Sequence, residues 1–361
     1  MNVSAGYMGK EGNNYMAGIM EGQTGNQNVT WETAKKLNVG FDLGLLNNRL
    51  NLVFDWYRRD TKGMLAPGAE LPAVLGASAP LQNTADLRSK GWEITVDWND
   101  QIGKVKYNLG FNLYDAKTKI TKYNNETGLF GKDKNDKDTY RVGMELGEIW
   151  GYVTDRLYTV DDFDADGKLK AGIPKVEGYN PNPGDILYKD LDDNDIINGG
   201  TSTTKDPGDR KIIGNEEPRY IYSFTLSADW KGLDFSAFFQ GSIGNDIYKL
   251  YRRSNVTFGN YDKSWLNRWH GEGTSNYVPR LSTQDHNENF TKFSSFYIED
   301  GSYLRLKNLQ LGYTFKKIPG VNKLRLYIAG QNLFTLTGYN GVEPEVSGSV
   351  LSFGFGGWTY P

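Results

Sequence analysis

The sequence predicts an all-β chain, an antiparallel up-and-down transmembrane β-barrel segment with at least eight strands and long extracellular loops. Three observations favour this fold class. Apolar and polar residues alternate with period two in eight separate stretches. Short turns and long connections alternate between those stretches. Aromatic side chains lie near the ends of the stretches, where the two membrane interfaces would be.

The period-two stretches define the expected strands in chain order. In the first, Leu37, Val39 and Phe41 alternate with polar or small residues. The eight expected strands are residues 37–45, 50–57, 90–98, 105–113, 220–230, 233–239, 303–315 and 324–332. In 303–315 the phase changes after Leu306, and a β-bulge near Lys307–Asn308 would return the later apolar residues to the same face.

Each expected strand has one apolar face and one polar face. We expect the apolar face to be the convex, lipid-facing side and the polar face to be the concave side. The residues expected on the lipid side are Leu37, Phe41, Trp92, Val96, Leu109, Phe224, Leu226, Phe235 and Leu326. Those expected on the concave side are Asn38, Asp42, Glu93, Asn108, Thr225 and Asp234.

The connections also favour a membrane barrel, in which short turns lie on the periplasmic side and long loops lie outside. The short turns are at 46–49, 99–104, 231–232 and 316–323, and the long connections are 58–89, 114–219 and 240–302. Residues 114–219 contain apolar clusters and are expected to form a folded extracellular excursion, whereas 240–302 are expected to form a long loop. The patterning leaves an alternative open, a soluble β-sandwich whose apolar face is its core.

Composition excludes several classes of protein. A chain of 361 residues suggests two domains at about 150 residues each, although a barrel of this length can form one unit. No cysteine is present and the only histidines are His270 and His286, which excludes thiol chemistry and multi-histidine metal centres. A net charge of -3 argues against nucleic-acid binding. No nucleophile–base constellation is visible, so we do not expect an enzyme.

Seven strings of residues carry a family resemblance. They are Gly25–Glu32, Trp56–Leu65, Asn83 with Lys90–Glu93, Pro183–Ile186 with Asp190–Asp192, Ile213–Asn215 with Pro218–Tyr220, Ser302–Leu309, and Gln331–Tyr339 with Pro344–Glu345. In this order they resemble the C-terminal barrel portion of the SusC/RagA family of TonB-linked outer-membrane transporters. Ser302–Leu309 is the most specific string, and Asp195 departs from the family pattern because the family has Gly there.

The resemblance implies a TonB-energised nutrient importer in the outer membrane of a Gram-negative bacterium. Its expected partners are outer-membrane lipid, a SusD-like lid lipoprotein, the TonB complex, and an oligosaccharide or peptide ligand. We recognise no signal peptide, TonB-contacting segment, plug domain or closing strand in residues 1–361, and TonB would be contacted through an N-terminal part. We therefore expect an incomplete barrel, eight of the about 22 strands that the resemblance implies. The alternative function is a soluble or surface-attached all-β glycan-binding module.

Two acidic loops could bind calcium, although the expected import activity requires no cofactor. Asp162, Asp164 and Asp166 precede Gly167 with the spacing that opens an EF-hand loop, but Ile173 stands where a bidentate Glu is needed. The second candidate set is Asp190, Asp192 and Asn194. The other interpretation of both sets is an acidic surface turn.

Aromatic side chains in the long connections could stack on the apolar faces of sugar rings. The candidates are Trp150, Tyr152, Tyr158, Tyr179, Tyr251, Trp265 and Trp269. For any one of them, packing within the loops is the competing interpretation.

Overall fold

Eight antiparallel strands form one sheet in which strands adjacent in sequence are adjacent in space. The structure is a computed structural model, and it describes residues 3–11, 14–21, 26–67, 80–123, 140–249, 261, 263–315, 318–341 and 343–345. The sheet order is β3-β4-β5-β6-β13-β14-β17-β18. Their bounds are β3 Thr33–Leu45, β4 Leu50–Pro67, β5 Leu81–Ile102, β6 Val105–Lys122, β13 Tyr220–Trp230, β14 Leu233–Ile243, β17 Tyr303–Phe315 and β18 Leu324–Thr337. The predicted up-and-down meander is confirmed.

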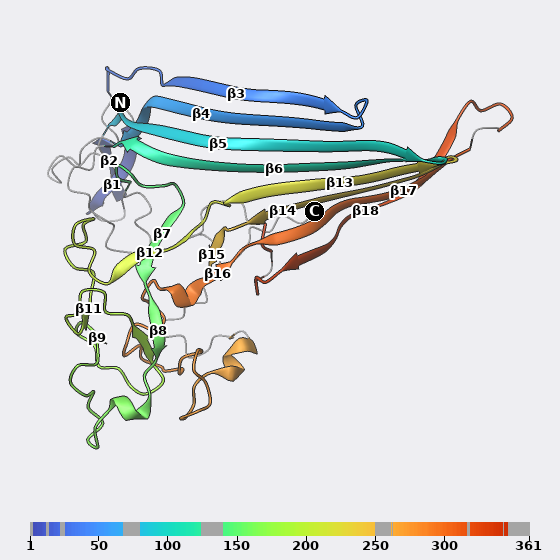
Figure 1. Cartoon of the computed structure of the whole chain (residues 1–361). Helices are drawn as coiled ribbons and strands as arrows, with labels where there is room; N and C mark the ends of the chain where they lie inside the picture. The colour runs from blue at the N-terminus through green and yellow to red at the C-terminus, as the bar shows by residue number, and fades with distance from the viewer. Residues whose placement is uncertain are drawn as a thin grey trace.

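Short turns lie together at one end of the sheet and long connections at the other (Figure 1). The β13–β14 turn consists of Lys231 and Gly232, both with positive φ, at 50° and 97°. Two successive positive φ angles match the right-handed twist of the flanking strands. The β5–β6 turn is also two residues long, Gly103 and Lys104. The sheet therefore has the loop arrangement that the sequence predicts.

Strand pairing places the two predicted sets of side chains on opposite faces. Val96 pairs with Phe111, which pairs with Phe224, so one apolar row crosses β5, β6 and β13. Thr225 pairs with Gly110, which pairs with Asp97, in a row on the other face. The same register keeps all nine predicted lipid-side residues on one face and the six predicted polar residues on the other.

The predicted bulge is present at Lys307. In β14 the register shifts so that Phe238 pairs with Asn308 while Phe239 pairs with Leu306, which leaves Lys307 unpaired. Opposite Lys307, β18 has two residues, Asn332 and Leu333, and Asn332 has a φ of 49°. The bulge restores the apolar phase of β17 because Leu309 and Leu311 then share a face with Leu306.

Several strands are longer than predicted. β4 continues ten residues beyond Tyr57 to Pro67, β5 begins at Leu81 rather than at Lys90, and β6 continues to Lys122. Beyond Trp56 and Trp92 the formerly apolar face carries Arg58, Asp60, Arg88 and Lys90, so the alternation on which the prediction rests disappears. Trp56 and Trp92 consequently lie inside strands and not at their ends.

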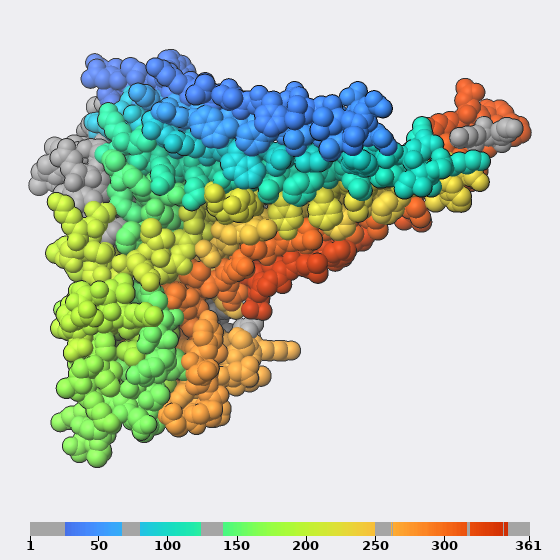
Figure 2. Space-filling model, in the orientation of Figure 1, coloured from blue at the N-terminus to red at the C-terminus, as the bar shows by residue number. Residues whose placement is uncertain are grey.

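The long connections fold into a separate lobe beside the long-loop end of the sheet (Figures 1 and 2). Its elements are β7 Glu148–Tyr152, β8 Thr154–Leu157, η2 Val160–Asp162, β9 Lys175–Val176, β10 Ile186–Tyr188, β11 Ile196–Ile197, β12 Arg210–Asn215, β15 Asp246–Tyr248, η3 Lys263–Asn267, η4 Ser295–Tyr297 and β16 Ile298–Asp300. Its main core contains Leu157, Val176, Ile186, Tyr188 and Ile197. Residues 114–219 thus contain the predicted folded excursion, whose first part continues β6.

The segment 240–302, which was predicted to be a long loop, contains strands. Its first residues complete β14, and β15 pairs with β16 across it. Tyr248 and Tyr297 from this segment form a second core with Ile149 from the excursion. We call residues 140–219 and 244–302, in their described parts, the loop lobe.

Near the start of the chain, β1 Val3–Glu11 and β2 Asn14–Glu21 form a two-stranded hairpin that the sequence analysis did not predict. Within the described ranges, no helix has both the length and the apolar character needed to cross a bilayer.

Candidate functional site

Buried amides and one carboxylate join the two halves of the loop lobe. Asp185 is 2% exposed and accepts hydrogen bonds from Asn289 Nδ2 at 2.8 Å and from the Asn182 N–H at 2.7 Å. Asn289 Oδ1 accepts from the Ile186 N–H at 2.9 Å, and Asn287 Nδ2 donates to the Ile186 carbonyl at 2.7 Å. Burial raises the pKa of the Asp185 carboxyl. Asp185 belongs to one of the seven strings that carry the family resemblance, but the sequence does not reveal these hydrogen-bond partners.

Two of the predicted ligand-stacking aromatics are enclosed in the loop lobe. Tyr158 is 1% exposed and donates its hydroxyl to the Pro174 carbonyl at 2.5 Å. Trp265 is 6% exposed and packs near Phe290 and Phe296. Neither ring has a free face for a ligand in this conformation. Packing, the competing interpretation, describes both of them.

Three other predicted aromatics are partly accessible. Trp150 has the Arg141 guanidinium 5.0 Å from a ring centroid, and Tyr152 has Lys292 Nζ at 4.1 Å. Burial raises the pKa of the Tyr152 hydroxyl to about 12, so the phenol stays neutral. Trp269 packs against the main core of the lobe and close over Gly184.

Tyr179 is the most exposed of the six described candidates, at 36%. Tyr251 lies outside the described residues. Four rings, those of Trp150, Tyr152, Tyr179 and Trp269, therefore remain as predicted contact residues for a ligand.

The first acidic loop uses its carboxylates for its own structure. Asp162 accepts from Arg156 Nη1 at 2.5 Å and Nη2 at 2.8 Å, and from the Thr159 N–H at 2.7 Å. Partial burial alone would raise the pKa of Asp162, but the Arg156 and Thr159 hydrogen bonds outweigh burial and lower it. Asp164 Oδ1 accepts from the N–H groups of Asp166 and Lys168. This geometry favours the acidic-turn interpretation, because Arg156 occupies both oxygens of Asp162.

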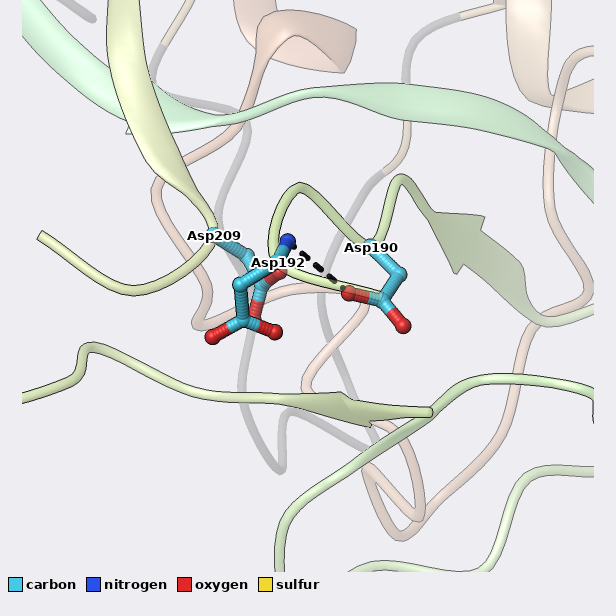
Figure 3. A group of neighbouring side chains, drawn as sticks. All are labelled: Asp190, Asp192 and Asp209. Carbon is cyan, nitrogen blue, oxygen red and sulfur yellow. Dashed lines mark hydrogen bonds between the residues drawn. The ribbon is translucent and has the colours of Figure 1, made fainter. Parts of the chain in front are cut away.

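The second acidic loop brings three carboxylates together (Figure 3). One oxygen each from Asp190, Asp192 and Asp209 lie within 4.8 Å of one another. Asp209 is fully buried, and its oxygens accept from the N–H groups of Leu191 and Asn198, both at 2.8 Å. Asn194 instead accepts from the Ile196 N–H at 2.7 Å. Asp209 was not among the predicted ligands because it lies far along the chain from Asp192.

The pKa values of the three carboxyl groups in this cluster are shifted in different directions. Burial raises the pKa of Asp209, and loss of water contact together with the negative charge of Asp209 raises the pKa of Asp192. Desolvation also acts on Asp190, but backbone N–H groups of residues 192–195 outweigh it and lower its pKa. A hard cation would relieve the repulsion among these oxygens. Calcium binding here stays a prediction, with Asp209 added to the ligand set.

The polar face of the sheet carries hydrogen-bonded rows between strands. Asn38 Nδ2 donates to Asp55 at 3.0 Å, and Thr95 Oγ1 donates to Asn112 at 2.7 Å. Arg325 Nε donates to Asp234 at 3.0 Å across β14 and β18. These groups hydrogen-bond to one another on a face of exposed and half-buried polar side chains, which is the character of a barrel interior and not of a dry core.

A family model described as "TonB dependent receptor-like, beta-barrel" matches residues 2–333. The chain belongs to this TonB-dependent receptor β-barrel family. Members of the family are outer-membrane proteins. The resemblance drawn from the seven sequence strings is thereby confirmed.

Curated relatives support the same assignment. The chain is 32% identical to TonB-dependent receptor P3 of Formosa agariphila over 349 residues, which is 93% of this chain and 33% of that protein. It is 26% identical to TonB-dependent receptor SusC of Bacteroides thetaiotaomicron over 342 residues, 90% of this chain and 31% of SusC. The chain thus spans about a third of the length of these relatives, which are named as receptors and not as enzymes.

Solved structures show the same fold. The RagAB peptide transporter matches with a TM-score of 0.68 at 22% identity, over 96% of this chain and 36% of that chain. The RagAB peptide importer in its "closed-closed" state matches with a TM-score of 0.69 at 22% identity, again over 96% and 36%. The eight-stranded meander is therefore a barrel wall of the TonB-dependent receptor type.

Proposed function

We propose that this chain forms part of the barrel wall and the extracellular lobe of a TonB-energised nutrient importer in the outer membrane of a Gram-negative bacterium. The observation that carries the proposal is the two-faced sheet. One face is apolar from β3 to β18 and has no protein layer against it in the described parts of the chain, while the other carries the polar rows. Such a sheet is stable where lipid meets one face and water the other.

Glycan oligosaccharides are the first expected substrate class and peptides are the second. Trp150, Tyr152, Tyr179 and Trp269 are partly accessible in the loop lobe, and aromatic faces suit sugar rings as well as peptide side chains. The peptide class is supported by the fold match to RagAB, which is a peptide transporter. A SusD-like surface lipoprotein is the expected partner on the side of the long loops.

An uptake assay tests the proposal. The natural protein would be expressed in cells that lack it, and entry of labelled oligosaccharides and labelled peptides would be measured with and without TonB. We expect TonB-dependent uptake of one class. Protein that sits in the outer membrane yet imports neither class, or imports without TonB, contradicts the proposal.

A matched pair of variants sharpens the assignment of the lobe. Tyr179→Ala removes an exposed ring, whereas Tyr179→Phe keeps the stacking face and removes only the hydroxyl. If Tyr179 contacts the ligand by stacking, the Ala variant loses uptake and the Phe variant retains it.

The alternative, a soluble glycan-binding module, predicts protein that stays folded in water without detergent.

A further inference from the structure

Beyond the aromatic row, the outer face of β4–β6 becomes cationic. Trp56 pairs with Trp92, and one pairing step toward the long loops Arg58 pairs with Lys90, which pairs with Lys117. Side chains two residues apart on a strand share a face, so these three cations stand side by side directly beyond the two tryptophans. Like charges directly opposite one another on neighbouring strands are destabilising. A row of three therefore needs a compensating anion.

The following row and its neighbours only partly supply that compensation. Asp60 is shared by Arg58 at 2.8 Å and Arg88 at 2.6 Å. Glu145 is shared by Lys117 at 2.9 Å and Lys119 at 3.8 Å.

Arg219 completes the group by pairing with Asp115. Six cations thus face three carboxylates. Lys90, in the middle of the row, is exposed and forms no ion pair with another described residue.

Five of these cations, all but Arg58, line a groove of about 690 Å³, together with the single carboxylate of Asp115. Its lining includes Trp56, Lys90, Trp92, Lys117, Lys119 and Arg219. The side chains of Lys117, Lys119 and Arg219 are 45%, 57% and 38% exposed, so their charged ends can reach a ligand while keeping their carboxylate partners. The groove therefore combines an aromatic floor with an excess of positive charge.

The height of the groove matches the level of lipid headgroups. The outer side chains of β13 run from Tyr220 to Trp230, which is ten residue steps. At a rise of about 3.3 Å per residue and a tilt of about 40°, this length spans roughly 25 Å along the membrane normal. The apolar band of a membrane barrel has the same height. Tyr220 lies near Trp92, with ring centroids 6.4 Å apart, so both mark one interface. Lys90 lies about 7 Å farther along its strand, where headgroup phosphates are found.

We propose that this groove binds the phosphate group of a phosphorylated lipid in the outer leaflet. It opens on the lipid-facing side of the sheet, so a solute on the import path through the barrel would not meet it. Basic side chains at this level attract anionic headgroups, and Trp56 and Trp92 would lie against the adjoining glycolipid or acyl region. The proposal rests on the membrane insertion proposed above but not on any transported substrate.

The test uses the complete natural protein in detergent and native mass spectrometry. The probes are lipid A carrying both phosphates, the same lipid without phosphate, and inorganic phosphate. Lys90→Gln combined with Lys117→Gln should weaken binding of phosphorylated lipid A by about tenfold or more. Lys90→Arg with Lys117→Arg should retain binding, which separates loss of charge from misfolding.

Lys36 and Arg59 pair with each other across β3 and β4 and lie at the same height on the opposite face. The matched control, Lys36→Gln with Arg59→Gln, removes these two cations. It should leave lipid binding unchanged. Equal losses in both double variants, equal binding of the phosphate-free lipid, or equally tight binding of inorganic phosphate would each overturn the proposal. If the protein imports its substrate but binds no lipid, the lipid site alone fails. If the protein is stable in water without detergent, the proposed function fails too.

Discussion

The sheet and the loop lobe bury apolar side chains in opposite ways. In the sheet, the apolar residues of β3 point away from the protein, and Leu37 and Val39 are 56% and 59% exposed. In the loop lobe, Tyr248 is fully buried and stacks on Phe293 with ring centroids 4.0 Å apart. The sheet therefore depends on lipid as its apolar partner, whereas the lobe contains its own core. The same change of polarity should have different consequences in the two regions.

The largest expected effect is in the core of the lobe. Tyr248→Ala should destabilise the lobe by about 3–5 kcal/mol, because truncating a buried aromatic ring leaves a cavity. Hydrogen exchange should rise in β7, β15 and β16 while protection of β5 and β6 is retained. Tyr248→Phe is the control and should preserve the ring packing. Loss of protection throughout the sheet would show that the two regions are not independent.

In the sheet, the corresponding test is a charge on the lipid side. Val96→Arg should cost about 2–4 kcal/mol of folding free energy if residue 96 lies near the bilayer midplane. The neighbouring Thr95→Arg places the same charge on the polar face and should cost far less. Unfolding by urea in lipid vesicles measures both. Equal costs for the two variants would contradict the assignment of the faces.

A smaller, pH-dependent effect is expected in the first acidic loop. Asp162 has a lowered pKa in the folded protein, so its stabilising contribution is complete above its unfolded value of 3.8 and is lost as the pH falls through the folded value. Asp162→Asn should therefore lower the stability of residues 156–170 by about 1–3 kcal/mol at pH 7. The two proteins should converge at pH values below the folded pKa. Exchange rates of this segment at pH 7 and under strong acid test both statements.

The smallest expected effect concerns calcium. If Asp190, Asp192 and Asp209 bind calcium, chelation should increase proteolytic cleavage near residues 190–209 and leave the sheet intact. Calcium should increase the free energy of unfolding of the lobe by RT ln(1 + [L]/Kd) and thereby raise its melting temperature. Asp192→Asn should reduce that increase. Asp193→Asn, an adjacent substitution outside the cluster, is the control. A melting temperature that does not respond to calcium would remove the metal hypothesis.

The sequence predicted the sheet well because each lipid-crossing strand has to alternate. The faces, the meander and the bulge at Lys307 all follow from that constraint. The ends of β4, β5 and β6 could not be predicted in the same way. Above the aromatic row both faces carry polar or charged side chains, so Arg58, Lys90 and Lys117 show no period-two contrast with their neighbours.

The loop lobe was predicted to be folded, but its contacts were not predicted. Asp185 meets Asn289 across 104 residues, and Asp209 joins Asp190 and Asp192 through a chain reversal. The spacing of residues within a short stretch of sequence cannot predict contacts between residues so far apart in the chain. The acidic string Asp162–Gly167 resembled a cation loop because spacing does not reveal Arg156 as the partner of Asp162.

Those long-range contacts also set an order of events during folding. The β13–β14 and β5–β6 hairpins close two-residue turns, so their strands can find each other quickly. Thr154 meets Ser295 across 141 residues, and closing a loop of that length costs more chain entropy than closing a two-residue turn. The lobe should therefore consolidate last, after the wall has assembled. A late-closing lobe would leave Asp185 and Asn289 exposed to surface proteases during biogenesis, and time-resolved cleavage would record the delay.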